Sequence, residues 1–293
     1  MNLALIQDGE RPTRASRHLL KAIKDLGHKA YYIPFEFMNA EVGKIMGVRV
    51  GLQELELDGI LLRGLRSDLS LEQYLARYAI LKHIEMLGIP TVNEVDPLFL
   101  ARNKYMALLT AYMAGIPVPE TLLTENLAMG YKVVKEWNDV VIKPIAGSRG
   151  VGSMRFSDPD MAFFAMKSLK RFSQPLMIQK YVNKPNRDIR VFVVGREVIA
   201  SMYRYAPPGN WKTNIAQGGR GVACDPSGEV KEIAIRVVEV FKLDYAGIDI
   251  VESEEGPLLL EVNASADFEE LMRVTGVDIP KRIVQRLIEK VKK

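Results

Sequence analysis

Apolar and polar positions alternate along the first third of the chain in a pattern that predicts strands separated by helices. Continuous apolar runs predict four short strands, at residues 3–6, 29–33, 59–62 and 91–93. Apolar residues at helical spacing predict helices over 13–26 and 70–87, each followed by a glycine. This alternation is typical of a small parallel α/β sheet.

From about residue 96 the pattern becomes mixed. Asp96 as N-cap and Pro97 as the first helical residue predict a helix that continues through 101–114. Strands are expected at 121–124, 140–144, 152–156 and 176–182, with a helix over about 160–170. The last third predicts a hairpin around Gly195, a long loop at 206–221, a helix at 230–243, a hairpin at 246–263 and a terminal helix capped by Asp278. The predicted class is α/β followed by α+β.

Composition limits the kinds of protein that fit. The chain has 293 residues, which suits about two domains, and its 48% hydrophobic and 26% charged residues are typical of globular proteins. It contains no apolar run of about 18 residues and no signal-like N-terminus. Cys224 is the single cysteine, which excludes an internal disulfide and a cysteine-based zinc site. We therefore expect a cytoplasmic enzyme or binding protein that uses neither membrane nor nucleic acid.

A glycine-rich stretch at 140–153, VVIKPIAGSRGVGS, raises the possibility of phosphate binding. It is not a P-loop, because its lysine precedes the glycines, and its G-x-x-G-x-G order differs from the dinucleotide fingerprint. The pattern instead predicts a strand, a flexible glycine turn and a returning strand. Such a turn can close over a polyphosphate and present backbone N–H groups. It can equally be an ordinary hairpin, and these residues alone leave both interpretations open.

The hairpin predicted at 246–263, AGIDIVESEEGPLLLEVN, carries the strongest chemical signal. Antiparallel pairing around the turn places Asp249 opposite Glu261, and Asn263 shares a face with Glu261 because side chains alternate along a strand. Opposed carboxylates repel each other, so this arrangement favours a hard cation between them, such as Mg²⁺. The alternative is a hairpin with solvated surface charges, but Asp249 and Glu261 are embedded in apolar strands.

Together these segments resemble the ATP-grasp ligases, specifically the RimK-type α-L-glutamate ligases. The resemblance runs from end to end through RNKYMALLTAYMAGIPVPET, VVIKPIAGSRGVGS, IQKYVNKPNRDIRVFVVG, WKTNIAQGGRG and AGIDIVE…LLLEVNAS. It implies an N-terminal Rossmann-like domain at 1–95, a central lobe with a glycine-rich lid at 96–178, and a C-terminal lobe with a metal site at 179–293. Residues 66–93 look most like archaeal ligases that add glutamate to pterin-type cofactors.

The resemblance also implies roles for individual residues. Those expected to bind ATP are Lys104, Lys143, Gly147, Ser148, Arg149, Gly150, Val151, Gly152, Gln179, Lys180, Tyr181, Val182 and Asp188. Arg204, Lys212 and Asn214 match groups around the transferred phosphoryl group, and Arg190 is either a substrate-carboxylate anchor or a structural ion-pair partner. Asp249, Glu261 and Asn263 match the ligands of Mg²⁺ or Mn²⁺, with two ions expected.

The activity that the resemblance implies is formation of an amide bond by way of an acyl phosphate, with release of ADP and phosphate. L-Glutamate or another amino acid would be joined to an acidic small molecule or protein, by an enzyme that is a dimer or tetramer. Phosphoryl transfer depends on positioning and electrostatics, which agrees with the lack of a nucleophilic triad in the sequence.

One stretch departs from the glutamate ligases. Asn263 and Ser265 are followed by Ala266–Asp267–Phe268–Glu269, where many members have proline and a glycine-rich turn. This stretch resembles the carrier-protein ligases of lysine biosynthesis, so a ligase that modifies an amino group with an acidic carrier protein is the alternative function. A non-catalytic ATP-binding regulator is disfavoured because the lysines, Arg204 and the metal ligands are all present.

Overall fold

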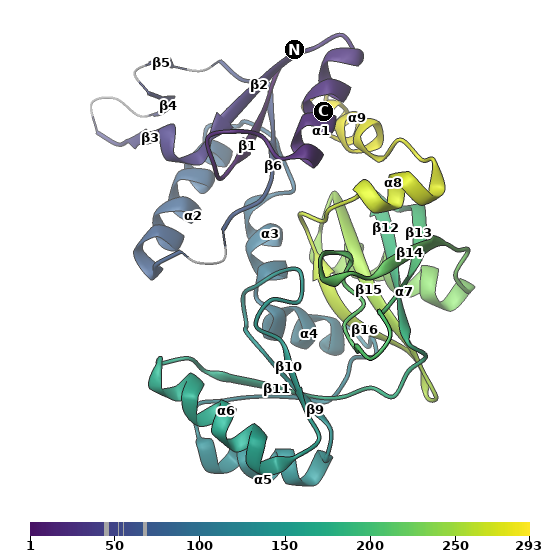
Figure 1. The fold of residues 1–293 in the computed structure, drawn as a ribbon. Coiled ribbons are helices and arrows are strands. Elements are labelled where there is room, and N and C mark those ends of the chain that lie inside the picture. Colours follow the sequence, from purple (N-terminus) through teal and green to yellow (C-terminus); the bar gives the residue numbers. More distant parts are fainter. Residues whose placement is uncertain (44–46, 52, 55, 67–68) are drawn as a thin grey trace.

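The computed structural model describes residues 1–43, 47–51, 53–54, 56–66 and 69–293. The N-terminal part contains a four-stranded parallel sheet in the order β2-β1-β6-β7 (Figure 1). Its strands are β1 (Asn2–Gln7), β2 (Lys29–Pro34), β6 (Gly59–Leu62) and β7 (Thr91–Val92). Helix α1 (Arg14–Asp25) connects β1 to β2, and helix α2 (Leu71–Met86) connects β6 to β7. These elements confirm the parallel α/β arrangement predicted from the alternating pattern.

A second, three-stranded antiparallel sheet in this part was not predicted. It consists of β3 (Met38–Glu41), β4 (Gly47–Val50) and β5 (Gln53–Glu54) and follows the short 3₁₀ helix η1 (Phe35–Phe37). Its strands are only two to four residues long, too short to give a clear period in the sequence.

The helix predicted from Asp96 is two helices, α3 (Val95–Arg102) and α4 (Lys104–Met113). Asp96 is not its N-cap: α3 begins one residue earlier, and the Asp96 carboxylate instead accepts hydrogen bonds from Tyr78 and Lys82. The break falls at Asn103, whose side chain accepts a hydrogen bond from the backbone N–H of Met106 and so caps α4. The new N-terminus places Lys104 at the first position of α4.

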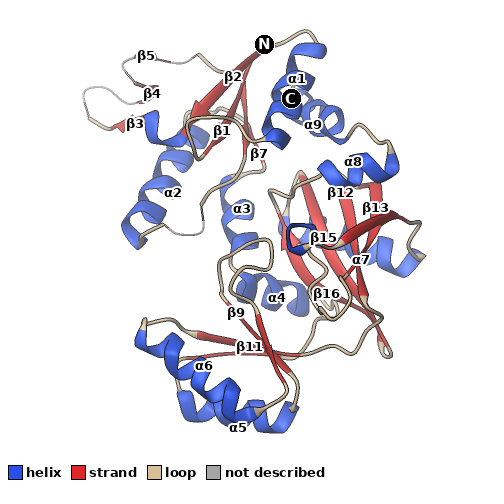
Figure 2. Ribbon diagram, in the orientation of Figure 1, coloured by secondary structure: helices blue, strands red, loops and turns tan. Residues whose placement is uncertain are grey.

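The central lobe is an antiparallel sheet in the order β10-β9-β11-β8 covered by two helices (Figure 2). The strands are β8 (Thr121–Thr124), β9 (Val140–Lys143), β10 (Met154–Phe156) and β11 (Leu176–Lys180), and the helices are α5 (Leu127–Trp137) and α6 (Pro159–Arg171). Helix α5 was not predicted. Because β11 extends to Lys180, we propose a lobe boundary after Lys180 rather than the expected one after residue 178.

The C-terminal lobe is a five-stranded antiparallel sheet in the order β14-β13-β12-β15-β16. The strands are β12 (Arg187–Val194), β13 (Glu197–Tyr205), β14 (Arg220–Ala223), β15 (Tyr245–Ser253) and β16 (Gly256–Asn263). The helical segments are η2 (Ile215–Gln217), α7 (Gly228–Phe241), α8 (Glu269–Thr275) and α9 (Ile279–Val291). Both predicted hairpins are present, whereas β14 and α8 were not predicted.

The last helix returns to the beginning of the chain. Helix α9 packs against α1, and their buried faces share one core that includes Leu19, Ile23, Ile283 and Leu287 (Figure 1). The C-terminal lobe is therefore joined to the N-terminal sheet by apolar packing as well as by the chain. Within the described residues, none of the helices combines the length and the apolar character needed to cross a bilayer.

Candidate active site

A row of charged side chains crosses four adjacent strands of the C-terminal sheet. It starts at Arg204 on β13, continues through Asp188 and Arg190 on β12 and Asp249 on β15, and ends at Glu261 on β16. Three cross-strand pairs build the row: Asp188 with Arg204, Arg190 with Asp249, and Asp249 with Glu261. Residues that are directly paired on adjacent strands project from the same face of the sheet, as do residues two apart on one strand.

Arg204 is held by carboxylates on both sides. Its Nε and Nη2 atoms donate to the two oxygens of Asp188 at 2.7 and 2.8 Å, and its Nη2 lies 3.0 Å from Asp249 Oδ2. Asp188 also accepts a 2.5 Å hydrogen bond from the Thr213 hydroxyl. Burial disfavours the charged guanidinium, but the attraction of Asp188 and Asp249 outweighs it and raises the pKa of Arg204 above its usual value.

Asp249 is the centre of the row. Arg190 donates to both of its oxygens, at 2.5 and 3.0 Å, so the ion-pair interpretation of Arg190 is observed directly. Burial of Asp249 would raise the pKa of its carboxyl group, but Arg190 and Arg204 outweigh burial and hold that pKa below its usual value. The carboxylate is therefore ionised at neutral pH.

Glu261 and Asn263 extend the row on β16. Asp249 and Glu261 are directly paired across the two strands, as the hairpin pattern predicted, and Asn263 Nδ2 lies 3.4 Å from Asp249 Oδ2. A β-bulge shifts the register directly after Asp249. Because of the bulge, the neighbouring residues Leu260 and Glu261 line the same cleft, which regular alternation would forbid.

The glycine-rich stretch forms the predicted hairpin. Strands β9 and β10 pair antiparallel, with Met154 opposite Ile142, and the turn between them lies over the charged row. Two lysines hold the turn: Lys104 Nζ donates to Gly147 O at 2.5 Å and Lys212 Nζ donates to Gly150 O at 3.1 Å. Lys104 also forms a 3.1 Å ion pair with Glu261. The lid, which we define as residues 146–153, is thus in contact with both lobes.

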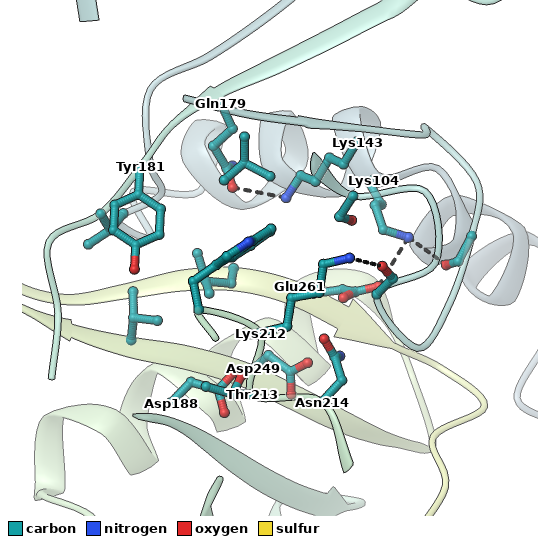
Figure 3. A pocket seen from close by; sticks show the side chains of 18 of the residues that line it. Lys104, Lys143, Gln179, Tyr181, Asp188, Lys212, Thr213, Asn214, Asp249 and Glu261 are labelled. Carbon is teal, nitrogen blue, oxygen red and sulfur yellow. Dashed lines mark hydrogen bonds and ion pairs between the residues drawn. The ribbon is translucent and has the colours of Figure 1, made fainter. Parts of the chain in front are cut away.

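Lys143 lies on the opposite wall of the cleft from Asp249, with Lys104 beside it (Figure 3). Its Nζ donates to Gln179 Oε1 at 2.9 Å. Burial is the main cause that lowers the pKa of Lys143 to about 8; Lys104 lowers it further, while Glu261 and Asp249 act in the opposite direction. An anionic ligand between Lys143 and Lys104 would compensate the charge of both.

One end of this cleft is apolar. Val182 comes directly after Tyr181, and Trp211 from the 206–221 loop lies edge-on to Tyr181 with ring centroids 6.3 Å apart. Val141, Val251 and Leu260 also line the cleft. Sequence reasoning missed Trp211, because irregular loops give no periodic signal for the direction of a side chain. An apolar slot next to lysines suits a flat base attached to a polyphosphate.

Most of the predicted site residues meet in this cleft. Its lining includes Lys104, Lys143, Gly147, Ser148, Gly150, Val151, Gln179, Lys180, Tyr181, Val182, Asp188, Arg204, Lys212, Asn214, Asp249 and Glu261. Arg149, Arg190 and Asn263 line a second chamber instead, and Gly152 lines neither cavity. Gly152 has a φ of +77° and so serves the turn itself.

The second chamber adjoins the cleft at the charged row. Residues common to both cavities are Lys104, Gly147, Ser148, Arg204, Asn214, Asp249 and Glu261. The chamber measures about 560 Å³, within the range of small-molecule sites, whereas the cleft under the lid measures about 120 Å³. The cleft under the lid is thus smaller than the usual range of small-molecule sites.

The far wall of the chamber contains the stretch that departs from the glutamate ligases. Phe268 is fully buried and packs edge-on against Phe192, so it belongs to the core. Asp267 and Glu269 line the chamber. The stretch at 266–269 therefore adds charge to the chamber and leaves the charged row unchanged.

The residues present fit a hard divalent cation. Asp249 and Glu261 face each other across one strand pair, Asp249 is ionised, and the Asn263 amide lies next to it. Two carboxylates and an amide oxygen are a typical donor set for Mg²⁺. Glu261 is the more accessible carboxylate, with a side chain that is 26% exposed, while both oxygens of Asp249 already accept from arginines.

Comparison with known proteins agrees with this geometry. Residues 101–287 match the RimK-like ATP-grasp domain. Tetrahydromethanopterin:alpha-L-glutamate ligase of Methanocaldococcus jannaschii is 33% identical over 222 residues, which cover 74% of this chain and 76% of that protein. A probable alpha-L-glutamate ligase of Haemophilus influenzae is 32% identical, over 70% of this chain and 69% of that protein. Because the relatives include bacterial proteins, an archaeal source stays a prediction.

Solved structures share the fold along the whole chain. A RimK domain ATP-grasp protein from Sphaerobacter thermophilus has a TM-score of 0.78 at 19% identity and covers 98% of this chain and 100% of that chain. The ATP-grasp ligase PsnB complexed with a minimal precursor, Mg and ADP has a TM-score of 0.74 at 22% identity, over 99% of this chain and 97% of that chain.

Fold and site together define an ATP-grasp enzyme, in which two lobes enclose a cleft under a glycine-rich lid. The chain belongs to the RimK-like ATP-grasp family. It is an ATP-dependent ligase that joins a carboxylate to an amine.

Proposed function

We propose that this ligase adds L-glutamate to an acceptor that carries a carboxylate, with ATP bound under the lid and the acceptor in the second chamber. The relatives named as α-L-glutamate ligases support glutamate as the amine donor. The observation that carries the proposal is that three members of the charged row, Arg204, Asp249 and Glu261, line both cavities and so form their common wall.

In this proposal, the base of ATP occupies the apolar end of the cleft near Tyr181 and Trp211. Lys104 and Lys143 bind phosphate oxygens, and Arg204 stabilises the charge of the transferred phosphoryl group. Asp188 holds the Arg204 guanidinium in place by two hydrogen bonds, so we propose that Asp188 acts as a positioning residue rather than as a ribose ligand.

We propose that Asp249, Glu261 and Asn263 hold divalent cations, two of them when ATP is bound. Bound there, the cations would supply positive charge against the phosphate oxygens of ATP. The chain's own part in the reaction is to place the acceptor carboxylate beside the γ-phosphoryl group at the common wall. Transfer gives ADP and an acyl phosphate; attack by the amine of glutamate then forms the amide bond and expels phosphate.

The acyl phosphate has to be protected from water until the amine arrives. The lid and the 206–221 loop both contribute residues that line the two cavities, and Lys212 of this loop donates to Gly150 of the lid. We propose that this contact closes the cleft during the reaction, which excludes water from the intermediate.

The test is incubation of the purified protein with Mg-ATP, either L-glutamate or another amino acid, and three kinds of acceptor: a pterin cofactor with an acidic tail, peptides with acidic C-termini, and an acidic carrier protein. We expect ADP and a product heavier by one glutamate residue with one kind of acceptor. ADP formation that needs the carrier protein and another amino acid would support the alternative function. No ADP with any acceptor would contradict the proposal.

A further inference from the structure

The lid carries an arginine whose side chain does not face the nucleotide cleft. Arg149 lies between Ser148 and Gly150, which both line that cleft, yet the Arg149 side chain lines the second chamber. Its backbone has a φ of +59°, a left-handed conformation that costs energy for a residue with a side chain. Gln217 donates to the Arg149 carbonyl at 3.3 Å and helps to hold this conformation.

Asp267 forms an ion pair with the Arg149 guanidinium in this structure. Its Oδ2 accepts from Arg149 Nη2 at 3.1 Å, while its Oδ1 lies 3.4 Å from Arg63 Nη2. One carboxylate thus bridges an arginine of the lid and an arginine that follows β6 of the N-terminal sheet. Asp267 belongs to the stretch that departs from the glutamate ligases, so this bridge depends on a particular feature of this chain.

The two halves of the bridge differ in burial. The Arg63 side chain is 4% exposed, donates to Ala266 O at 2.8 Å and lies over the Phe268 ring at 5.5 Å. The Arg149 side chain is 62% exposed and Asp267 is 53% exposed. Exposed ion pairs contribute little to stability. The Arg149–Asp267 contact can therefore be exchanged for another carboxylate, while Arg63 keeps Asp267 in place.

We propose that Arg149 binds a second carboxylate of the acceptor, distinct from the one that is phosphorylated, and that Asp267 pairs with Arg149 until the acceptor arrives. This inference rests on the proposed function and specifies its substrate class as acceptors with at least two acidic groups. Because Arg149 is part of the lid, binding of this carboxylate links occupancy of the chamber to closure over ATP.

Other charges of the chamber favour an anionic ligand. Arg102, which also lines it, donates to the main-chain carbonyls of Leu65 and Arg66 at 2.7 and 2.8 Å. Among the residues that the structure describes, the chamber lining contains seven arginine and lysine residues and five aspartate and glutamate residues, namely Arg63, Arg66, Arg102, Lys104, Arg149, Arg190 and Arg204 against Asp249, Glu261, Asp267, Glu269 and Glu270. Basic side chains outnumber acidic ones, which favours binding of a dicarboxylate.

The test compares N-acetyl-Glu-Glu, which carries three carboxylates, with N-acetyl-Gln-Gln, which carries one and so cannot supply both a carboxylate for phosphorylation and a second one for Arg149. Calorimetry measures their Kd for protein saturated with Mg²⁺ and a non-hydrolysable ATP analogue. We expect the wild type to bind N-acetyl-Glu-Glu at least fivefold more tightly. In Arg149→Gln this preference should fall below twofold, with an unchanged Kd for the ATP analogue. Arg171→Gln, an exposed arginine at the end of α6, is the matched control and should retain the preference.

Three results would overturn the inference: equal affinity of the wild type for both probes, no binding of either probe, or a preference that survives in Arg149→Gln. Loss of affinity for the ATP analogue in Arg149→Gln would show that Arg149 binds the nucleotide instead. Asp267→Asn should tighten binding of N-acetyl-Glu-Glu about twofold to threefold because the competing carboxylate is gone; weaker binding would contradict the pairing role. ADP formation by the wild type tests the proposed function separately.

Discussion

Arg204 Nη2 lies 3.0 Å from Asp249 Oδ2, and the two side chains are only 5% and 4% exposed. Asp188 holds the same guanidinium from the other side. A guanidinium that is fixed between two buried carboxylates cannot follow a moving substrate. In the proposed function, the acceptor carboxylate and the phosphate therefore have to be brought to Arg204, which is the role proposed for the second chamber and the lid.

Removal of Arg204 should be costly. In Arg204→Ala, the buried carboxylates of Asp188 and Asp249 lose a common partner, so we expect the free energy of unfolding to fall by about 3–5 kcal/mol. Arg196→Ala is the matched control, because Arg196 forms an exposed pair with Glu239 on the same lobe and should change it by about 0–1 kcal/mol. Chemical denaturation measures both. Equal losses in the two variants would show that the buried pairs do not stabilise the lobe.

Lys143 predicts a pH dependence of nucleotide binding. Its pKa of about 8 in the free protein means that the ammonium form predominates below pH 8. A bound phosphate favours that form, so above pH 8 binding must take up a proton and the affinity should fall as the pH rises. Titration of a fluorescent ADP analogue between pH 7 and 9.5 measures this decline. Lys143→Arg keeps its charge throughout and should show a flat profile; a decline in both forms would assign the effect to another group.

The surroundings of Gly150 predict that this position of the lid has to be glycine. A Cβ atom at Gly150 would lie 2.6 Å from Asn214 Oδ1, across the gap between the lid and the 206–221 loop. Gly150→Ala should therefore lower kcat at least tenfold by preventing closure. Gly195→Ala is the control: Gly195 also has a positive φ, but a Cβ atom there has open space. The closure argument fails if Gly195→Ala loses as much activity as Gly150→Ala.

The proposed role of Glu261 as a metal ligand predicts how turnover depends on Mg²⁺. Glu261→Gln removes the charge of the more accessible carboxylate of the proposed metal site, so turnover should fall at least a hundredfold and the Mg²⁺ concentration for half activity should rise. Glu255→Gln, at the exposed turn of the same hairpin, should leave both quantities unchanged. Circular dichroism checks that both variants are folded. Full activity of Glu261→Gln would exclude it as a metal ligand.

The row of charged residues could be predicted from the sequence only in part. A period of two and a turn near Glu254 predicted the Asp249–Glu261 pair only approximately, because the turn alone would place Asp249 opposite Leu260 and the bulge after Asp249 brings Glu261 there. Asp188 pairs with Arg204 because a register shift lies between Phe192 and Val193. Without that shift the hairpin turn would place Asp188 opposite Tyr203. A bulge depends on local twist and packing that the apolar pattern does not report.

Other features escaped prediction for similar reasons. The strands β3 to β5 and the helix α8 are too short for a period to show, and the break at Asn103 lies inside a continuous helical pattern. The resemblance assigned Arg149 to the nucleotide, and the structure shows that Arg149 lines the second chamber. The direction of its side chain depends on a positive φ, which the sequence does not predict for an arginine.

The most direct test of the account follows oxygen atoms through the reaction. The acceptor identified by mass spectrometry is labelled with ¹⁸O in its carboxylates and incubated with the enzyme, Mg-ATP and L-glutamate. If the carboxylate is phosphorylated before the amine attacks, each amide bond formed transfers one ¹⁸O atom into the released phosphate. Phosphate that contains no ¹⁸O, despite formation of the amide product, would contradict activation of the acceptor carboxylate by ATP.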